Sequence, residues 1–135
     1  MNARTRAVRR TVVGTVITGM VTALGLLAPS SANAAASDCA AGYLCVWDGA
    51  NYTGNKCSWQ NADADWWSGS VVCSWADDRV VKSIYNHGTS SAYAGVTIYY
   101  GANYASPIGC VYQGQMGTGT GVMIRSHKWT TTCTN

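Results

Sequence analysis

Short runs of β-branched and aromatic residues recur along the chain after residue 40, and polar or glycine-rich segments separate them. Runs of this length and composition predict β-strands. No segment after Ala34 keeps the apolar period of an α-helix for three turns, and the one helical feature we expect is a short turn over residues 62–67. The predicted strands are Leu44–Trp47, Lys56–Trp59, Val80–Tyr85, Val96–Tyr100, Cys110–Tyr112 and Val122–Arg125.

Glycine, asparagine and aspartate mark the segments between these runs, which predicts an all-β domain with tight turns. The glycine-rich stretch Gly117–Gly121 is expected to be one of the turns. The chain has no phenylalanine, so its 6 tryptophans and 8 tyrosines must supply the aromatic volume of the core. Their N–H and O–H groups need hydrogen-bond partners wherever the rings are buried.

The first 34 residues have the pattern of an export signal. Four arginines precede an apolar stretch over residues 11–28, and the small-residue site Ala32-Asn33-Ala34 follows. A membrane anchor is the alternative, but this site favours cleavage. We therefore expect a signal peptide at 1–34, cleavage after Ala34, and a secreted domain at 35–135 that has no membrane contact once the signal is removed.

The net charge of +3 for the whole chain comes from the leader. After residue 34 there are 5 lysines and arginines against 6 aspartates, which gives the mature segment a charge of −1. A binding surface for nucleic acid or anionic lipid needs clustered basic residues. The sequence therefore predicts neither partner.

All six cysteines follow the leader, and an even number in a small exported domain indicates three disulfides. The sequence allows several connectivities, and we expect neighbours to pair. A zinc site is the alternative, but no CxxC motif is present and His87 and His127 are not spaced as a ligand pair. The expected pairs are Cys39 with Cys45, Cys57 with Cys73, and Cys110 with Cys133.

An aromatic frame occurs twice in the chain. Trp47, Tyr52 and Gly54 recur 52 residues later as Tyr99, Tyr104 and Ser106, and each copy follows an apolar strand. In each copy the first aromatic can pack over a tight hairpin against the second. Two such units would close into one sandwich. Because Ser106 replaces the glycine, we expect the second hairpin to be looser or to be closed differently.

The frame, followed by a serine in a later strand, resembles the Greek-key motif of the βγ-crystallin fold. Ser83 would be the serine of the first motif, and Ser126 is the candidate in the second. Three segments narrow the resemblance to secreted bacterial peptidase inhibitors of the Streptomyces metalloproteinase inhibitor type: Cys39–Cys45, Trp75–Gly88 and Thr97–Val111. The resemblance implies a disulfide-stapled sandwich of two Greek keys. It also implies a monomer that needs no cofactor, with an extracellular protease, by preference a metalloprotease, as its partner.

The resemblance places the inhibitory contact on Cys110, Val111 and Tyr112, in a rigid loop that docks like a substrate. In that family pattern a small disulfide loop holds the scissile bond. Here no cysteine follows Cys110 within six residues, so the small loop is missing. The alternative is that these residues form an interior strand with core contacts.

Three other functions compete with inhibition. The first is catalysis, but the mature segment contains no glutamate and no nucleophile motif, which argues against an enzyme. Calcium binding would use Asp77 and Asp78, as the crystallin pattern implies, but Lys82 stands where another oxygen ligand is expected. Glycan binding would use exposed aromatic faces, and we expect these residues mainly in the core: Trp66, Trp67, Tyr99, Tyr100 and Trp129.

We expect mass spectrometry of the exported protein to find Ala35 at the N-terminus and no free thiol. The reason is that the small-residue site directs cleavage after Ala34, and the oxidising exterior drives disulfide formation. An intact leader together with free cysteines would contradict the prediction of export.

Overall fold

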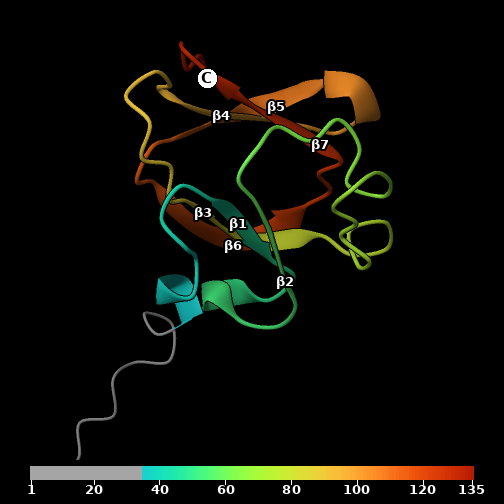
Figure 1. The fold of residues 1–135 in the computed structure, drawn as a ribbon. Helices are drawn as coiled ribbons and strands as arrows, with labels where there is room; N and C mark the ends of the chain where they lie inside the picture. The colour runs from blue at the N-terminus through green and yellow to red at the C-terminus, as the bar shows by residue number, and fades with distance from the viewer. Residues whose placement is uncertain (1–34) are drawn as a thin grey trace, which may run out of the picture.

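The computed structural model describes residues 35–135, which form two antiparallel sheets lying one over the other (Figure 1). Two short 3-10 helices follow the strands that begin the two halves. The all-β prediction is confirmed. The elements in order are β1 (Leu44–Trp47), η1 (Ala50–Tyr52), β2 (Lys56–Trp59), β3 (Val81–Asn86), β4 (Gly95–Tyr99), η2 (Ala102–Tyr104), β5 (Pro107–Tyr112), β6 (Met116–Val122) and β7 (Ser126–Thr130).

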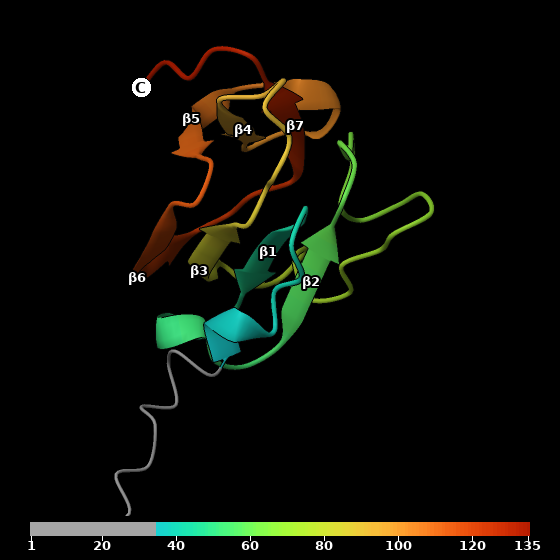
Figure 2. The same cartoon turned by 60° about the vertical axis from the view of Figure 1, so that its left-hand side comes forward.

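The domain divides into a first half that holds β1–β3 and a second half that holds β4–β7. Each sheet is completed by a segment from the half that does not supply its other strands. The four-stranded sheet has the order β2-β1-β3-β6, so β6 leaves the second half to pair with β3. The three-stranded sheet has the order β5-β4-β7, and an isolated bridge joins Asp63, from the first half, to His127 of β7. Figure 2 shows β6 beside β3 at the edge of the lower sheet. This exchange ties the two halves into one unit.

Apolar side chains from both sheets fill the space between them. Trp66 is fully buried and stacks on Trp59 with 4.3 Å between ring centroids. The indole N–H groups of Trp59 and Trp75 have no hydrogen-bond partner within the described residues, contrary to the expectation for buried tryptophans. The buried residues of this cluster are Leu44, Val46, Trp59, Trp66, Cys73, Trp75, Ala76, Val81, Val96, Ile98, Val111 and Ile124.

The two copies of the aromatic frame fold alike. Trp47 and Tyr52 meet edge to face with 5.4 Å between centroids, and Tyr99 and Tyr104 do so at 5.7 Å. The second aromatic of each pair has a positive φ, 61° for Tyr52 and 62° for Tyr104. The internal repeat therefore corresponds to a repeated structure.

The second hairpin is closed differently from the first, as one form of the prediction stated: Tyr100 N–H donates to Ser106 O, six residues on, whereas Asp48 N–H donates to Asn55 O, seven residues on. Ser106 adopts φ 58°, the same left-handed region as Gly54 at φ 82°. Glycine is required only in the first hairpin, because a Cβ at residue 54 would lie 2.2 Å from Asp48 Oδ1. The second hairpin is closed by hydrogen bonds of 3.0 Å from the N–H groups of Tyr100 and Gly101.

A buried serine locks each hairpin to the sheet. Ser83 Oγ accepts a hydrogen bond of 2.9 Å from Tyr52 N–H and donates one of 2.8 Å to Gly49 O. Ser126 Oγ accepts one of 3.1 Å from Tyr104 N–H and donates one of 2.6 Å to Gly101 O. The two serines thus satisfy main-chain groups in the turns that no sheet partner can reach.

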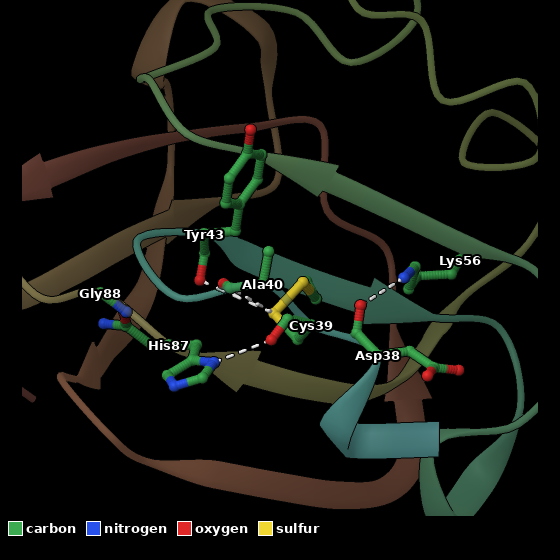
Figure 3. The surroundings of a disulfide bond; sticks show 9 residues. Asp38, Cys39, Ala40, Tyr43, Lys56, His87 and Gly88 are labelled. Atoms are coloured by element: carbon green, nitrogen blue, oxygen red, sulfur yellow. Dashed lines mark hydrogen bonds between the residues drawn. A yellow bond between two sulfur atoms is a disulfide. The ribbon is translucent and has the colours of Figure 1, made fainter. Parts of the chain in front are cut away.

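The three disulfides join the predicted neighbouring pairs, Cys39–Cys45, Cys57–Cys73 and Cys110–Cys133, which confirms that pairing. Figure 3 shows the first of them, which ties the segment before β1 to β1 itself. Beside this disulfide, His87 Nδ1 lies 2.8 Å from Cys39 O. Lys56 Nζ donates a hydrogen bond of 2.8 Å to Asp38 O.

Two local predictions are wrong, and a third holds only in part. The stretch Gly117–Gly121 lies inside strand β6, whereas the predicted strand over Val122–Arg125 is mostly the connection to β7. Two interactions stabilise this glycine-rich strand. Thr118 pairs with Ser83 of β3, and Thr118 Oγ1 accepts a hydrogen bond of 3.0 Å from Asn51 N–H. Residues 62–65 form no helical turn, because the main chain of Asp63 pairs with His127 instead, and one turn at Trp66-Trp67 is closed by a hydrogen bond of 3.0 Å from Ser68 N–H to Asp65 O.

The predicted signal peptide at residues 1–34 lies outside the described residues. Within residues 35–135, the structure contains no helix that is long and apolar enough to cross a membrane.

We expect Ser83→Ala and Ser126→Ala each to lower the free energy of unfolding by about 1–3 kcal/mol, because each leaves a buried N–H and a C=O of a turn without a partner. Chemical denaturation measures this change. Ser70→Ala, at an exposed position, serves as the control. Equal stability of all three variants would contradict the locking role of the serines.

Candidate functional site

The predicted contact residues lie in strand β5 rather than in a loop. Cys110 and Val111 are buried, and Val111 O accepts a hydrogen bond of 2.8 Å from Asn86 Nδ2. Only Tyr112, which is 48% exposed, could touch a partner directly. Side-chain packing between the sheets therefore removes the Cys110–Val111 bond from the surface, as the alternative of an interior strand predicts.

The outer edge of β5 is also occupied. Cys110 N–H donates a hydrogen bond of 2.7 Å to Asn135 Oδ1, and Tyr112 N–H donates one of 2.8 Å to Gln115 Oε1. A substrate-like inhibitor strand needs such groups free to pair with the protease. The capped edge therefore makes β5 a poor docking strand.

A second segment has the features that β5 lacks. Residues 67–72, here called the anchored loop, lie between Trp66 and Cys73. The loop belongs to the connection between β2 and β3, which extends beyond the sheets in both ribbon views (Figures 1 and 2). It exposes apolar side chains: Trp67 is 38%, Val71 41% and Val72 55% exposed.

The two ends of the anchored loop are held together. Cys73 N–H donates a hydrogen bond of 2.8 Å to Trp66 O, and Trp66 N–H donates one of 2.8 Å to Arg125 O. Cys73 is buried and forms a disulfide with Cys57 of β2. Six exposed residues therefore leave and re-enter the domain at one fixed point.

A buried histidine fixes the base of the loop. Trp66 Nε1–H donates a hydrogen bond of 2.8 Å to His127 Nδ1, and His127 Nε2 lies 3.0 Å from Asn61 O. These contacts require a neutral ring with its proton on Nε2. Burial lowers the pKa of His127 to about 4, against a smaller opposing effect of the hydrogen bond to Asn61.

An ion pair supports the start of the loop. Arg125 donates hydrogen bonds of 2.9 and 3.0 Å to the two carboxylate oxygens of Asp65. The same guanidinium lies 3.8 Å from the centroid of the Trp67 ring. The hydrogen bonds from Arg125 hold the pKa of Asp65 below its ordinary value, although desolvation opposes them. The Trp67 ring is thus held in one place although it is exposed.

The sequence pattern places Trp67 in the core or in a short helical turn and gives residues 68–72 no role, so it misses the loop. The available signal was the pair Val71-Val72 directly before Cys73, an apolar run that matches no strand partner. The position of the loop depends on contacts at its base, from Trp66 to His127 and from Asp65 to Arg125. Both partners are about 60 residues away along the chain.

The acidic calcium candidates are not brought together. Asp78 Oδ1 lies 3.8 Å from Arg79 Nε, and the Arg79 side chain also binds Asp48 at 2.8 Å. No group of three or more His, Cys, Asp or Glu side chains within residues 35–135 is arranged to hold a metal ion. Asp77 and Asp78 are both exposed.

Each of the two aromatic pairs divides between core and surface. Trp66 is buried and Trp67 exposed, and Tyr99 is buried and Tyr100 exposed. Trp129 is half-buried and lines a cavity. The expectation of core positions holds for one residue of each pair.

In a comparison with protein families, the model described as peptidase inhibitor family I36 matches residues 32–111, more than half of the chain. The matched region includes both the anchored loop and Cys110–Val111. No curated protein matches the chain.

We expect stability to fall as the pH is lowered from about 6.5 towards 4. In this range the unfolded chain protonates His127, whereas the native ring, with its pKa of about 4, stays neutral. Above about pH 6.5 both states are neutral and the effect vanishes. Denaturation at about pH 7 and pH 4.5 should differ by roughly 2–3 kcal/mol from this group. His127→Gln should reduce the change in the free energy of unfolding between these two pH values. The same change in the variant as in the wild type would contradict the role of His127.

Proposed function

The chain belongs to peptidase inhibitor family I36, the family of the Streptomyces metalloproteinase inhibitor, and on this basis we propose that it is a secreted inhibitor of an extracellular metalloprotease. Family membership implies that its partner is a peptidase and that the chain is not itself an enzyme. The three disulfides and the leader pattern support secretion. The family description supports a metalloprotease as the target class.

The inhibitory element we propose is the anchored loop. A protease cleft binds an extended segment, and this loop offers exposed apolar side chains at Val71 and Val72. Thermolysin-like enzymes favour an apolar residue on the leaving side of the bond, and either valine supplies one. Ordering of a flexible segment would cost affinity, and the fixed ends of the loop reduce that cost.

The same anchoring explains how a substrate-like loop can resist turnover. If the protease cut the loop, the disulfide to Cys57 and the hydrogen bond between Cys73 N–H and Trp66 O would keep the two new ends close together. The new amine would stay beside the new carboxylate, at a high effective concentration, so that resynthesis of the peptide bond, with loss of the water added by hydrolysis, competes with release. The single observation that carries the proposal is this closure at Trp66 and Cys73.

The β5 segment is the weaker contact. Tyr112 is exposed, but Cys110 and Val111 would have to leave the core to reach a cleft. Exposing the buried valine alone costs about 1.5–3 kcal/mol, before any hydrogen bond is broken.

The repeat also supports a more specific fold assignment. We assign the two hairpin units to two Greek-key motifs of the βγ-crystallin type. The repeated aromatic pairs, the two locking serines and the exchange of β6 and Asp63 between the sheets support this assignment.

We expect the secreted protein to inhibit a thermolysin-like metalloprotease. Val72→Asp should weaken inhibition by about thirtyfold or more, because the protease would bury this side chain in a contact of hot-spot strength and the variant places an unpaired charge there. Inhibition constants measured against metalloproteases and serine proteases check both statements. Tyr112→Ala should leave inhibition unchanged.

Met116→Asp, which places the same charge at another exposed apolar position, is the matched control. Thermal unfolding shows whether each variant remains folded. If Tyr112→Ala abolishes inhibition while Val72→Asp does not, the contact lies on β5. If the wild-type protein inhibits neither protease class, the proposed function itself is wrong.

A further inference from the structure

A cavity of about 520 Å³ lies away from the tip of the anchored loop. The segment after β2, the connection between β3 and β4, and strand β7 surround it. Ligand sites in proteins are typically concavities of about 300–1,000 Å³. The residues that matter for its chemistry are Gln60, Asn61, Ser90, Tyr93, Gln113 and Trp129.

We propose that this cavity binds a neutral oligosaccharide. Two features of the lining carry the inference: a pair of aromatic rings on one wall, and amide and hydroxyl side chains with no charged residue around them. The inference does not depend on the inhibitory function, because no residue of the anchored loop lines the cavity.

The aromatic wall consists of Tyr93 and Trp129, whose ring centroids lie 6.0 Å apart with their planes 35° from each other. Tyr93 is 40% exposed, so part of its ring is open to a ligand. Aromatic rings offer flat apolar surfaces, and the C–H faces of a pyranose are flat apolar surfaces of matching size. A sugar ring can therefore stack on this wall without burying a charge.

The tryptophan of this wall is held in place. Trp129 Nε1–H donates a hydrogen bond of 3.0 Å to Gln60 O. The ring also packs so closely on Gly88 that a Cβ at that residue would lie 2.6 Å from it. Asn86, which is buried, fixes Gly88 in turn by accepting a hydrogen bond of 2.9 Å from its N–H. The wall is therefore formed before any ligand binds, which lowers the entropy cost of binding.

The polar lining matches sugar hydroxyls. A hydroxyl both donates and accepts hydrogen bonds, and so does a side-chain amide. Gln113 Nε2 donates a hydrogen bond to Gly88 O, which leaves its carbonyl oxygen and its second N–H for a ligand. Gln60 and Asn61 add two more amides at the rim of the cavity.

The absence of charge selects among polar ligands. None of the lining residues is Asp, Lys, Arg or His. Phosphates, uronic acids and free amino acids carry charges that would lose hydration here without gaining an ion pair. A neutral sugar loses no such hydration, and this favours neutral over anionic glycans.

Calorimetric titration of the folded protein with cellotetraose, chitotetraose and tetragalacturonate tests the proposal. We expect saturable binding of at least one of the two neutral tetrasaccharides and weaker binding of the acidic one. Tyr93→Ala should weaken binding of the neutral tetrasaccharide by about tenfold, since one of the two stacking rings is lost. Gln113→Ala should weaken it as well.

Tyr100→Ala, at a tyrosine that is 54% exposed outside the cavity, is the matched control and should bind as the wild type does. Circular dichroism verifies that each variant is folded. Absence of binding by both neutral tetrasaccharides overturns the proposal, and so does equal binding by folded Tyr93→Ala. Tighter binding of tetragalacturonate would overturn the argument from charge. Val72→Asp should keep glycan binding, which separates this outcome from any loss of inhibition.

Discussion

The hydrogen bond from Trp66 Nε1–H to His127 Nδ1 joins the two halves of the domain at one buried point. His127 lies in β7 and its main chain pairs with Asp63, so the same residue closes the second sheet and supports the base of the anchored loop. The bond needs a neutral histidine, and burial keeps the ring neutral. The architecture and the candidate inhibitory surface thus depend on one protonation state.

Around this junction the structure combines rigid support with exposed apolar residues. A domain of this size has a small core, and each disulfide adds about 2–4 kcal/mol by restricting the unfolded chain. The Cys57–Cys73 disulfide also holds one end of the anchored loop, so the same bond serves stability and recognition. Val71 and Val72 can therefore remain at the surface in a loop whose ends are fixed.

Several elements could be predicted from the sequence because their causes are local. Strands β1 and β2 have the predicted bounds, and the repeated aromatic frame produces two hairpins with matching dihedral angles. The glycine-rich β6 could not be predicted, because what makes it a strand is its pairing with β3, about 35 residues earlier along the chain. The capped edge of β5 likewise depends on Asn135 at the C-terminus.

By itself the sequence determined the all-β class and the inhibitor family, since composition and motif spacing are properties of the chain. It favoured neighbouring disulfide pairs but allowed other connectivities, and the structure decided between them. Only the tertiary structure decided which apolar residues are accessible. It buried Val111 between the sheets and left Val72 exposed, although both are valines beside a cysteine. The physical reason is that exposure depends on what packs against a residue, and the residues of Val111's buried cluster come from distant segments, such as Leu44 and Ile124.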